Sequence, residues 1–458
     1  MANVAERNEA PKKQKGNVEA LRQTLKLQLD YDQLTNCMRC GFCLPVCPTF
    51  KITGIEAESP RGRISLMKAA VDGIMEPGIA FEDQMNHCLG CRACEPACPA
   101  DVKYGHLIEQ ARDAIEKHTT HRAWVNGVRH VLLKKVFPNQ KRMKLLGKGL
   151  EIYEKSGLQK FVRKTGSAGI LGEHMKNMEA IMPQGSSKGV VELMGTRIKA
   201  KGEKVATVAM FRGCMMDSMF IETNKNTIAL LSEAGFEIVI PDDQQCCGAI
   251  QAHSGEVAQA ELQAINNVKV FKDSGADYIV SNAGGCGALL VEYDHLLRNN
   301  NDMREDAKWF AGRVKDVSTL LADYGRPLKY AFKQNEAGAV ITYQDSCHLR
   351  NVMKGGANPR KLLKQIKGVQ YVEMKAAESC CGSAGTYNLT QPEMSNKILQ
   401  NKMVDARATA AQYIVTSNPG CLLQMKLGIH KHAEGKAMEA VHIVDFLYDC
   451  LQREESVK

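Results

Sequence analysis

Cysteine is the residue type in this 458-residue sequence whose number and spacing could do chemistry, because 17 cysteines are present. Eight of them form two runs with one pattern: three cysteines separated by pairs of residues, then a fourth that precedes a proline. The first run is Cys37, Cys40, Cys43 and Cys47. The second run is Cys88, Cys91, Cys94 and Cys98. Thiolates at such close spacing are typical ligands of zinc or iron.

The spacing of these runs favours iron–sulfur clusters over zinc. It matches the C-x₂-C-x₂-C-x₃-C-P pattern of two-cluster ferredoxins, in which the fourth cysteine ligates the other cluster. The predicted assignment therefore crosses over between the runs. One [4Fe-4S] cluster is expected on Cys37, Cys40, Cys43 and Cys98. The other [4Fe-4S] cluster is expected on Cys88, Cys91, Cys94 and Cys47. A zinc site needs only four ligands and rarely uses a doubled run that ends in proline.

Eight further cysteines form an internal repeat in the second half of the chain. Each copy supplies one cysteine, an adjacent Cys-Cys-Gly and a final cysteine, and the spacings of the two copies agree within one residue. The first set is Cys214, Cys246, Cys247 and Cys286. The second set is Cys347, Cys380, Cys381 and Cys421. Packed thiols would explain a single such cysteine, whereas two matching sets favour cofactor binding. One or two further iron–sulfur clusters are both compatible with this pattern.

Short β-branched segments alternate with helical ones in each copy, which predicts two α/β units with mostly parallel sheets. Strands are expected over 205–211, 236–241, 278–281, 339–343, 369–374 and 413–417. Helices are expected over 226–234, 258–271, 359–366 and 394–411. The cysteines follow the strands, and ligands of open α/β sheets gather at the carboxyl ends of strands. We therefore expect the repeated cysteines to share one crevice at the junction of the copies.

The overall prediction is an α+β multidomain chain with a helical, ferredoxin-like part followed by a helical segment and two α/β repeats. The expected domains are 1–29 (flexible segment), 30–118 (ferredoxin-like, two clusters), 119–200 (basic helices and linker), 201–330 (first repeat) and 331–458 (second repeat). Between 121 and 200 there are 16 Lys and Arg against 5 Asp and Glu. This basic segment is either a solvated helical face or a docking surface for an acidic partner or an anionic membrane.

Composition excludes several other classes. With 44% hydrophobic and 24% charged residues the chain is of ordinary globular type, and it has no apolar run of membrane-spanning length. The polar start of the sequence predicts a cytoplasmic chain with reduced thiols, with peripheral contact at the inner face of the cell membrane left open. No dinucleotide-binding fingerprint or phosphate loop is present, and nucleic-acid binding is not expected. Cys450 stands alone and is expected to be a packed thiol.

The order of two ferredoxin runs and two Cys-Cys-Gly repeats resembles the iron–sulfur subunits of bacterial glycolate oxidase (glycolate dehydrogenase). The resemblance covers residues 30–450. Its specific motifs are Cys40-Gly41-Phe42-Cys43, Ser59-Pro60-Arg61-Gly62-Arg63-Ile64, Cys246-Cys247-Gly248-Ala249, Gly285-Cys286-Gly287-Ala288, the run from Cys380 to Tyr387, and Asn401-Lys402-Met403. It implies an electron-transfer subunit without catalytic residues of its own. FAD on partner subunits would oxidise glycolate to glyoxylate, and the electrons would pass singly toward a quinone or another acceptor.

Related architectures leave alternatives open. Iron–sulfur subunits of lactate-oxidising complexes and of anaerobic glycerol-3-phosphate dehydrogenase are similar. Heterodisulfide reductase also resembles this chain, but its repeats end in C-x-x-C, where this sequence has Leu289 and Gln424. A free-standing disulfide reductase acting at the C-terminal cysteines and a zinc-stapled interaction scaffold are the two remaining hypotheses.

Overall fold

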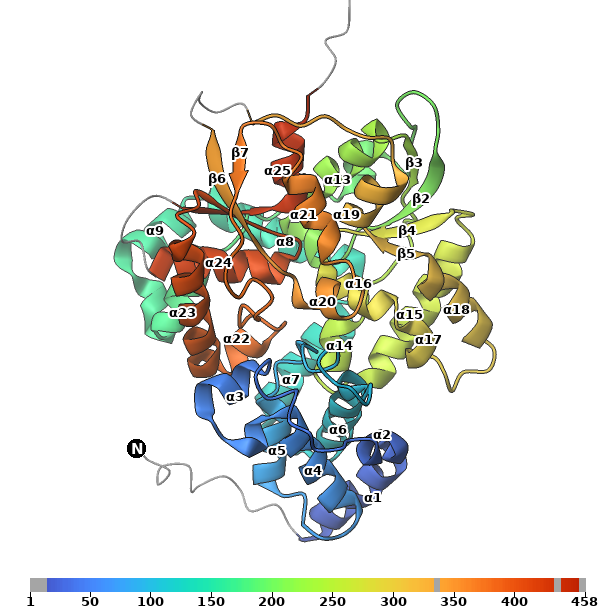
Figure 1. Ribbon diagram of the computed structural model, residues 1–458, viewed down its shortest axis with the longest axis vertical. Coiled ribbons are helices and arrows are strands. Elements are labelled where there is room, and N and C mark those ends of the chain that lie inside the picture. Colours follow the sequence, from blue (N-terminus) through green and yellow to red (C-terminus); the bar gives the residue numbers. More distant parts are fainter. Residues whose placement is uncertain (1–14, 333–337, 432–437, 453–458) are drawn as a thin grey trace, which may run out of the picture. The chain divides into compact units, whose positions relative to one another are not determined.

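The computed structural model describes residues 15–332, 338–431 and 438–452, and its chain divides into two compact units. The first unit comprises the residues up to 122 together with 252–256. The second unit comprises 123–251 and the residues from 257 onward. Figure 1 shows that the first unit is helical and that both sheets belong to the second.

The first unit is a cluster of helices around the two cysteine runs. Its helices are α1 (Lys15–Gln28), α2 (Tyr31–Thr35), α3 (Pro48–Thr53), η2 (Glu56–Glu58), α4 (Pro60–Val71), α5 (Ile79–Asn86) and α6 (Tyr104–His118). Leu21 and Leu25 of α1 are fully buried in one core with Leu107 of α6. The expectation of a flexible segment over 1–29 therefore does not hold for 15–29, whereas 1–14 lie outside the described residues.

Helix α4 has clear local determinants and lies between the two runs in sequence. The Ser59 hydroxyl accepts a hydrogen bond from the Gly62 amide at 3.0 Å, and Pro60 occupies the first helical position. Both features favour a helix start. Gly62 is required by close packing, because a Cβ there would lie 2.0 Å from the Glu56 carbonyl oxygen. This start fixes Arg63 on the buried side of the helix.

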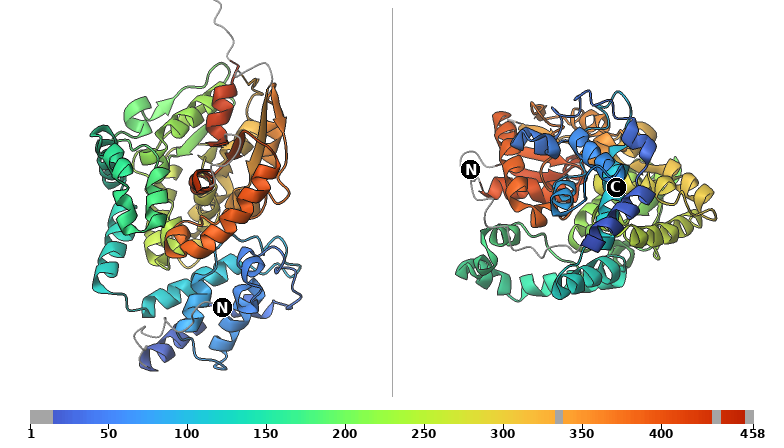
Figure 2. Two further views of the ribbon diagram at one scale, coloured as in Figure 1. Left: turned by 90° about the vertical axis from the view of Figure 1, so that its left-hand side faces the viewer. Right: turned by 90° about the horizontal axis from the view of Figure 1, so that it is seen from below.

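A series of helices opens the second unit. They are α7 (Ala123–Arg129), η3 (His130–Val136), α8 (Gln140–Lys155), α9 (Leu158–Thr165), η4 (Ser167–Leu171), α10 (Glu173–Ala180) and α11 (Val190–Met194). Met143 and Gly147 are the buried residues of α8. A Cβ at Gly147 would lie 2.2 Å from the Ser186 carbonyl oxygen, so this helix is held close to the chain that follows it. Figure 2 shows these helices along one side of the second unit.

Two sheets of the second unit have matching topology. The strands are β1 (Arg197–Ile198), β2 (Ala206–Phe211), β3 (Phe236–Val239), β4 (Tyr278–Ser281), β5 (Val314–Asp316), β6 (Ala339–Gln344), β7 (Val369–Tyr371), β8 (Tyr413–Thr416) and β9 (Glu439–His442). The orders are β1-β3-β2-β4-β5 and β7-β6-β8-β9, and every pair is parallel except β1 with β3. The six expected strands are present, and β1, β5 and β9 are additional.

Helices connect the strands in both copies, as expected for parallel pairing. In the first copy they are α12 (Met215–Met219), α13 (Ile221–Glu233), α14 (Ala249–His253), α15 (Val257–Lys272), α16 (Gly284–Leu290), α17 (Tyr293–Leu296), α18 (Arg304–Arg313), α19 (Val317–Thr319) and η5 (Leu320–Tyr324). In the second copy they are α20 (Cys347–Asn351), α21 (Ala357–Leu363), α22 (Tyr387–Thr390), α23 (Pro392–Ala408), α24 (Pro419–Lys431) and α25 (Ile443–Cys450). The four helices expected from the sequence correspond to α13, α15, α21 and α23.

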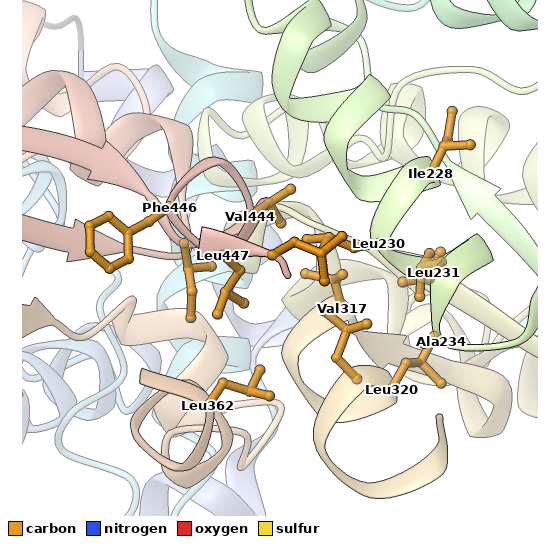
Figure 3. Packing of buried hydrophobic residues seen from close by; sticks show 14 of the residues in the cluster. Ile228, Leu230, Leu231, Ala234, Val317, Leu320, Leu362, Val444, Phe446 and Leu447 are labelled. Carbon is orange, nitrogen blue, oxygen red and sulfur yellow. The ribbon is translucent and has the colours of Figure 1, made fainter. Parts of the chain in front are cut away.

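The two copies share a single hydrophobic core. Side chains from α13, α19, α21 and α25 meet in one buried cluster, as Figure 3 shows. Leu230 and Leu231 come from the first copy, whereas Val444 and Leu447 come from the second, and all four are at most 1% exposed. Burying a side chain of this size is worth about 1.5–3 kcal/mol. The shared core therefore fixes how the two sheets, and the loops at their carboxyl ends, lie relative to each other.

Candidate metal centres

The structure gathers the eight N-terminal cysteines around two small cavities in the first unit. Four cysteines, Cys37, Cys40, Cys43 and Cys98, line one cavity together with Cys94. The second cavity is lined by Cys47, Cys88, Cys91 and Cys94. The second cavity thus takes three cysteines from the second run and one from the first, as the crossed assignment predicts. The first cavity takes three from the first run and two from the second, Cys98 and Cys94. Cys94 lies on the wall between them.

The donor set at both cavities fits iron–sulfur clusters. Apart from the thiols, the linings are mostly apolar groups such as Ile64 and Val102, and neither cavity is lined by a carboxylate or a histidine. Among the described residues, no three His, Cys, Asp or Glu side chains converge closely enough to hold a single metal ion. A cubane cluster does not need several side chains to converge on one metal ion, since each cysteine ligates a different iron. Cys47, Cys88, Cys91 and Cys94 are buried, whereas Cys40 is exposed.

Local backbone geometry turns the thiols inward. Cys47 precedes α3, and Pro48 at the first helical position starts the helix immediately after it. Its sulfur lies 3.2 Å from the Thr49 hydroxyl and 3.5 Å from the Glu58 carbonyl oxygen. In the second run, Gly90 has φ +64° and its amide donates to the Cys88 sulfur at 3.3 Å. The left-handed conformation, which favours glycine, thus directs a backbone N–H at the Cys88 sulfur.

Charged groups favour the thiolate form at Cys88. Burial opposes ionisation there, yet the cationic side chains of Arg63 and Arg112 hold the pKa of the Cys88 thiol below its ordinary value. The Tyr104 hydroxyl also donates to the Cys88 sulfur at 3.5 Å. By contrast, burial raises the pKa of Cys94 well above its ordinary value. The cationic surroundings of Cys88 therefore favour the thiolate, which is the metal-binding form of cysteine.

Arg63, which the sequence analysis named only as part of the Ser59–Ile64 motif, lines the second cavity. Its side chain is 1% exposed and forms an ion pair of 2.7 Å with Glu58, whose other oxygen lies 2.8 Å from His87 Nδ1. Arg63 also donates to the Glu58 carbonyl oxygen at 2.6 Å, the same oxygen that the Cys47 sulfur contacts. The sequence did contain a signal for its burial: Arg63, Met67 and Ala70 are spaced so that they share one face of a helix, and the other two are apolar.

The first repeat brings its four cysteines together at the carboxyl ends of its strands. Cys214 follows β2, the Cys246–Cys247 pair follows β3, and Cys286 lies in α16 after β4. The Cys214 and Cys246 sulfurs are 3.4 Å apart. Donation from Cys214 and Cys247 lowers the pKa of Cys246 well below its ordinary value. The pKa of Cys247 is raised well above its own by the contacts with Cys246 and Cys286 and by burial.

Three cysteines of the second repeat also converge. The Cys381 and Cys421 sulfurs are 3.4 Å apart, the Gly382 amide donates to Cys380 at 3.4 Å, and the Asn418 side chain donates to Cys421 at 3.6 Å. Donation from Cys380 favours a Cys381 thiolate, but the Cys421 contact and burial together raise the pKa of Cys381. This repeat contains a buried cation that the sequence analysis left without a role: Lys402 is 3% exposed and donates to the Ala376 carbonyl oxygen at 2.5 Å.

The carboxyl ends of the two sheets meet, as the repeat predicted. The Gly284 amide donates to the Ser417 carbonyl oxygen at 3.1 Å, and the Gly285 amide donates to the Asn418 side chain at 3.0 Å. Cys347, the fourth cysteine of the second repeat, begins α20, which packs against α16 of the first. A Cβ at Gly284 would lie only 2.2 Å from the Ser346 hydroxyl, so glycine permits this approach.

Leu289 and Gln424 occupy the positions where the repeats of heterodisulfide reductase have the last cysteine of C-x-x-C, and both side chains are buried. Leu289 is 5% exposed and belongs to α16. Gln424 is 1% exposed, and its amide nitrogen donates to the Ser395 hydroxyl at 3.0 Å. These contacts assign Gln424 to packing and hydrogen bonding in the second repeat. Each repeat therefore has four cysteines and no fifth at this position.

Comparison with known families agrees with this arrangement. Residues 33–102 match the 4Fe-4S dicluster domain, and 208–291 and 341–426 each match the cysteine-rich domain. Residues 124–182 match the linker region of the glycolate oxidase iron–sulfur subunit. No helix in the part of the chain that the structure describes is both long enough and apolar enough to cross a membrane.

Individual relatives point in the same direction. The chain is 46% identical to the probable glycolate oxidase iron–sulfur subunit of Bacillus subtilis, over 93% of this chain and 95% of the relative. It is 28% identical to the glycolate oxidase iron–sulfur subunit of Escherichia coli, over 85% and 88%. It is 32% identical to lactate utilization protein A of Oceanobacillus iheyensis, over 52% of this chain and 96% of the relative. The chain therefore belongs to the family of glycolate oxidase iron–sulfur subunits.

Proposed function

We propose that this chain is the electron-transfer subunit of a glycolate dehydrogenase complex. FAD on a partner subunit takes a hydride from glycolate, and this chain accepts the electrons singly and passes them toward a quinone or another acceptor. Two glycolate oxidase iron–sulfur subunits that align over most of their length support this role. The chain itself has no dinucleotide-binding fingerprint, so it depends on its partner for hydride chemistry.

The observation that carries the proposal is the pair of cysteine-lined cavities in the first unit. Cys37, Cys40, Cys43 and Cys98 hold one [4Fe-4S] cluster, and Cys47, Cys88, Cys91 and Cys94 hold the other. Such clusters supply one-electron redox chemistry. Cys94 borders both cavities, so clusters bound in them would be neighbours. An electron that reaches one cluster then has a short path to the next.

The C-terminal cysteines extend this redox role. Cys214, Cys246, Cys247 and Cys286 form one ligand set, and Cys347, Cys380, Cys381 and Cys421 form the other. Support comes from their mutual sulfur contacts and from the hydrogen bonds that join the two sheets. One or two further iron–sulfur clusters are accommodated by these sets. The proposed domains follow the same division: 30–118 carries the first two clusters, 119–200 is the helical linker, and 201–330 and 331–458 are the cysteine-rich repeats.

The test begins with the chain purified anaerobically, and iron, zinc and acid-labile sulfide are measured per chain. Two cubane clusters require about eight irons, and occupied repeats would raise this number to about twelve or sixteen. Electron paramagnetic resonance then follows the clusters after addition of the flavin subunit and glycolate. Reduction that requires both additions is the expected result. Zinc without iron, or glycolate oxidation by this chain alone, would refute the proposal.

Lactate is the second candidate substrate of the complex, because lactate utilization protein A aligns with half of this chain. The substrate is chosen by the flavin subunit and not by the clusters. The same reduction experiment with L-lactate and with glycerol 3-phosphate in place of glycolate separates these alternatives. Disulfide reduction by the isolated chain that is abolished by Cys380→Ser would instead support a heterodisulfide-reductase-like enzyme.

A further inference from the structure

The linker helices α7 to α10 expose an unusual amount of apolar surface. Of the 24 large hydrophobic side chains that lie exposed in the described residues, eleven fall between 124 and 175. They are Trp124, Val128, Val131, Leu132, Leu145, Leu146, Ile152, Leu158, Phe161, Ile170 and Met175. Single exposed hydrophobic residues need no explanation, but a concentration of this kind marks an interaction site.

These side chains share their faces with lysines. On α8, the exposed residues Lys141, Leu145, Lys148, Ile152 and Lys155 follow one another at helical spacing, while Met143 and Gly147 are buried on the other side. Trp124, Val128 and Val131 form a similar exposed stripe along α7 and η3. We call the exposed side of residues 124–165 the linker face. Both views in Figure 2 place these helices at one side of the second unit.

The charge of this segment accounts for the net charge of the whole chain. Residues 123–165 contain eleven Lys and Arg and two Glu, a net charge of +9, and the whole chain also has a net charge of +9. Some of these cations have partners within the fold: Lys144 pairs with Glu192, Lys155 with Glu151 and Arg163 with Glu179. Five others are exposed lysines, which an anionic surface can reach: Lys135, Lys141, Lys148, Lys160 and Lys164.

The kind of cation distinguishes a lipid surface from a protein surface. Eight of the eleven cations are lysines, and lysine is depleted at protein–protein interfaces. Lysines that flank exposed Trp, Phe and Leu are instead typical of helices that lie in the headgroup region of a membrane. There the apolar side chains enter the acyl boundary while the ammonium groups reach the phosphates.

We propose that the linker face docks this chain on an anionic phospholipid bilayer. The contact is peripheral. It rests on the proposed function in one respect: a complex docked in this way would have a membrane-bound electron acceptor at the same surface. Leu145, Ile152 and Phe161 enter the lipid boundary, and Lys141 and Lys148 neutralise phosphate charge. Each lysine near such a surface strengthens the affinity for the membrane about fivefold, and salt weakens this attraction.

The test uses the full-length holoprotein and flotation with vesicles of phosphatidylcholine alone or phosphatidylcholine with phosphatidylglycerol. We expect binding to the anionic vesicles only, weakened by salt. Lys141→Glu with Lys148→Glu should reduce that binding about 25-fold or more. The matched control is Lys269→Glu with Lys397→Glu, which makes the same charge change on exposed helix positions elsewhere in the second unit. The control should bind like the unmodified chain.

A second pair of variants tests the apolar contribution. Leu145→Ser with Ile152→Ser, at positions 69% and 57% exposed, should weaken binding severalfold. Leu262→Ser with Val404→Ser, at positions 62% and 66% exposed, should leave it unchanged. Equal binding to both vesicle types, or linker variants that float like their controls, would overturn the proposal. So would linker variants that lose the flavin subunit in gel filtration while still binding vesicles, because the face would then bind protein.

The outcome is separable from that of the proposed function. Cluster absorbance is recorded for every variant, which verifies both folding and iron content. If flotation fails while the flavin subunit and glycolate still reduce the clusters, only the docking proposal is refuted. If the chain contains no iron, the electron-transfer role is refuted whatever the vesicles show.

Discussion

Replacing Arg63 by methionine should lower the reduction potential of the cluster that we assign to Cys47, Cys88, Cys91 and Cys94. Reduction adds negative charge to a cluster, and a buried cation beside it stabilises that charge. Arg63 is fully buried, and its positive charge already lowers the pKa of Cys88 against the opposing effect of burial. Methionine fills a similar volume but carries no charge.

The magnitude follows from two hydrogen bonds. Arg63 Nη1 and the Cys47 sulfur contact the same Glu58 carbonyl oxygen at 2.6 and 3.5 Å, so their separation cannot exceed about 6 Å. One unit charge at about 6 Å, with an effective dielectric constant of about 20, is worth about 3 kcal/mol, or roughly 120 mV for one electron. The Glu58 carboxylate offsets part of this effect, and the added electron spreads over the cluster. We therefore expect a decrease of about 50–100 mV.

The assay is a redox titration of the holoprotein followed by electron paramagnetic resonance. Arg63→Lys keeps the charge and should shift the potential much less. Glu58→Gln leaves Arg63 uncompensated and should raise the potential, whereas the double variant Arg63→Met/Glu58→Gln should return toward the original value. The double variant also guards against misfolding, because removing one partner of a buried ion pair costs about 3–5 kcal/mol.

Arg61 offers a matched control for the same argument. Its ion pair with Glu56 is only 2.5 Å long, but both side chains are partly exposed, at 28% and 52%. Solvent screening should therefore make Arg61→Met a weak perturbation of the first cluster. An unchanged or raised potential in Arg63→Met, with both clusters present by resonance, would refute the electrostatic reasoning.

Three further outcomes are expected. Cys91→Ser should lose the iron of one cubane, whereas Cys450→Ser should leave iron content unchanged because Cys450 lies in the core shared by the repeats. Burial raises the pKa of Asp316 to about 6, so folding favours the protonated carboxyl and its contribution to stability is lost as pH rises through 6. In unfolding measured between pH 5 and 8, the unmodified chain should therefore lose about 1.4 kcal/mol relative to Asp316→Asn, which can still cap its helix. Gly284→Ala should cost about 1–3 kcal/mol through its clash with Ser346, and Ser346→Gly should recover part of that loss in a double-mutant cycle.

The parts of the fold that could be predicted are those with strong local patterns. The strands around Val208, Ile279 and Val415 are apolar runs between helices, and they are buried in the structure. Strands β5 and β9 have only three and four residues and include Lys315 and Glu439. Such short segments lack an apolar run, and pairing with a longer neighbour determines their conformation. Their positions therefore could not be read from the local sequence.

The N-terminal helix and the buried charges illustrate two other limits. Leu21 and Leu25 stand four residues apart, as on one helical face, but the lysine-rich composition around them suggested a frayed segment. For the cysteines, spacing alone predicted the four thiols of the second cavity and four of the five at the first, because ligand runs are local; it did not predict that Cys94 borders both cavities. The buried positions of Arg63 and Lys402 depend on tertiary packing, which periodicity can suggest but cannot establish.

The core shared by the two repeats has a consequence for biosynthesis. Helix α25, at residues 443–450, packs with α13 from the first repeat, so neither repeat has its full hydrophobic interior until residue 450 has left the ribosome. The first unit, in contrast, contains no residue beyond 256. Its two clusters can be inserted while translation continues. The repeats complete their common core only after α25 has been made, so maturation of this chain is divided into an early stage for the first unit and a later stage for the repeats.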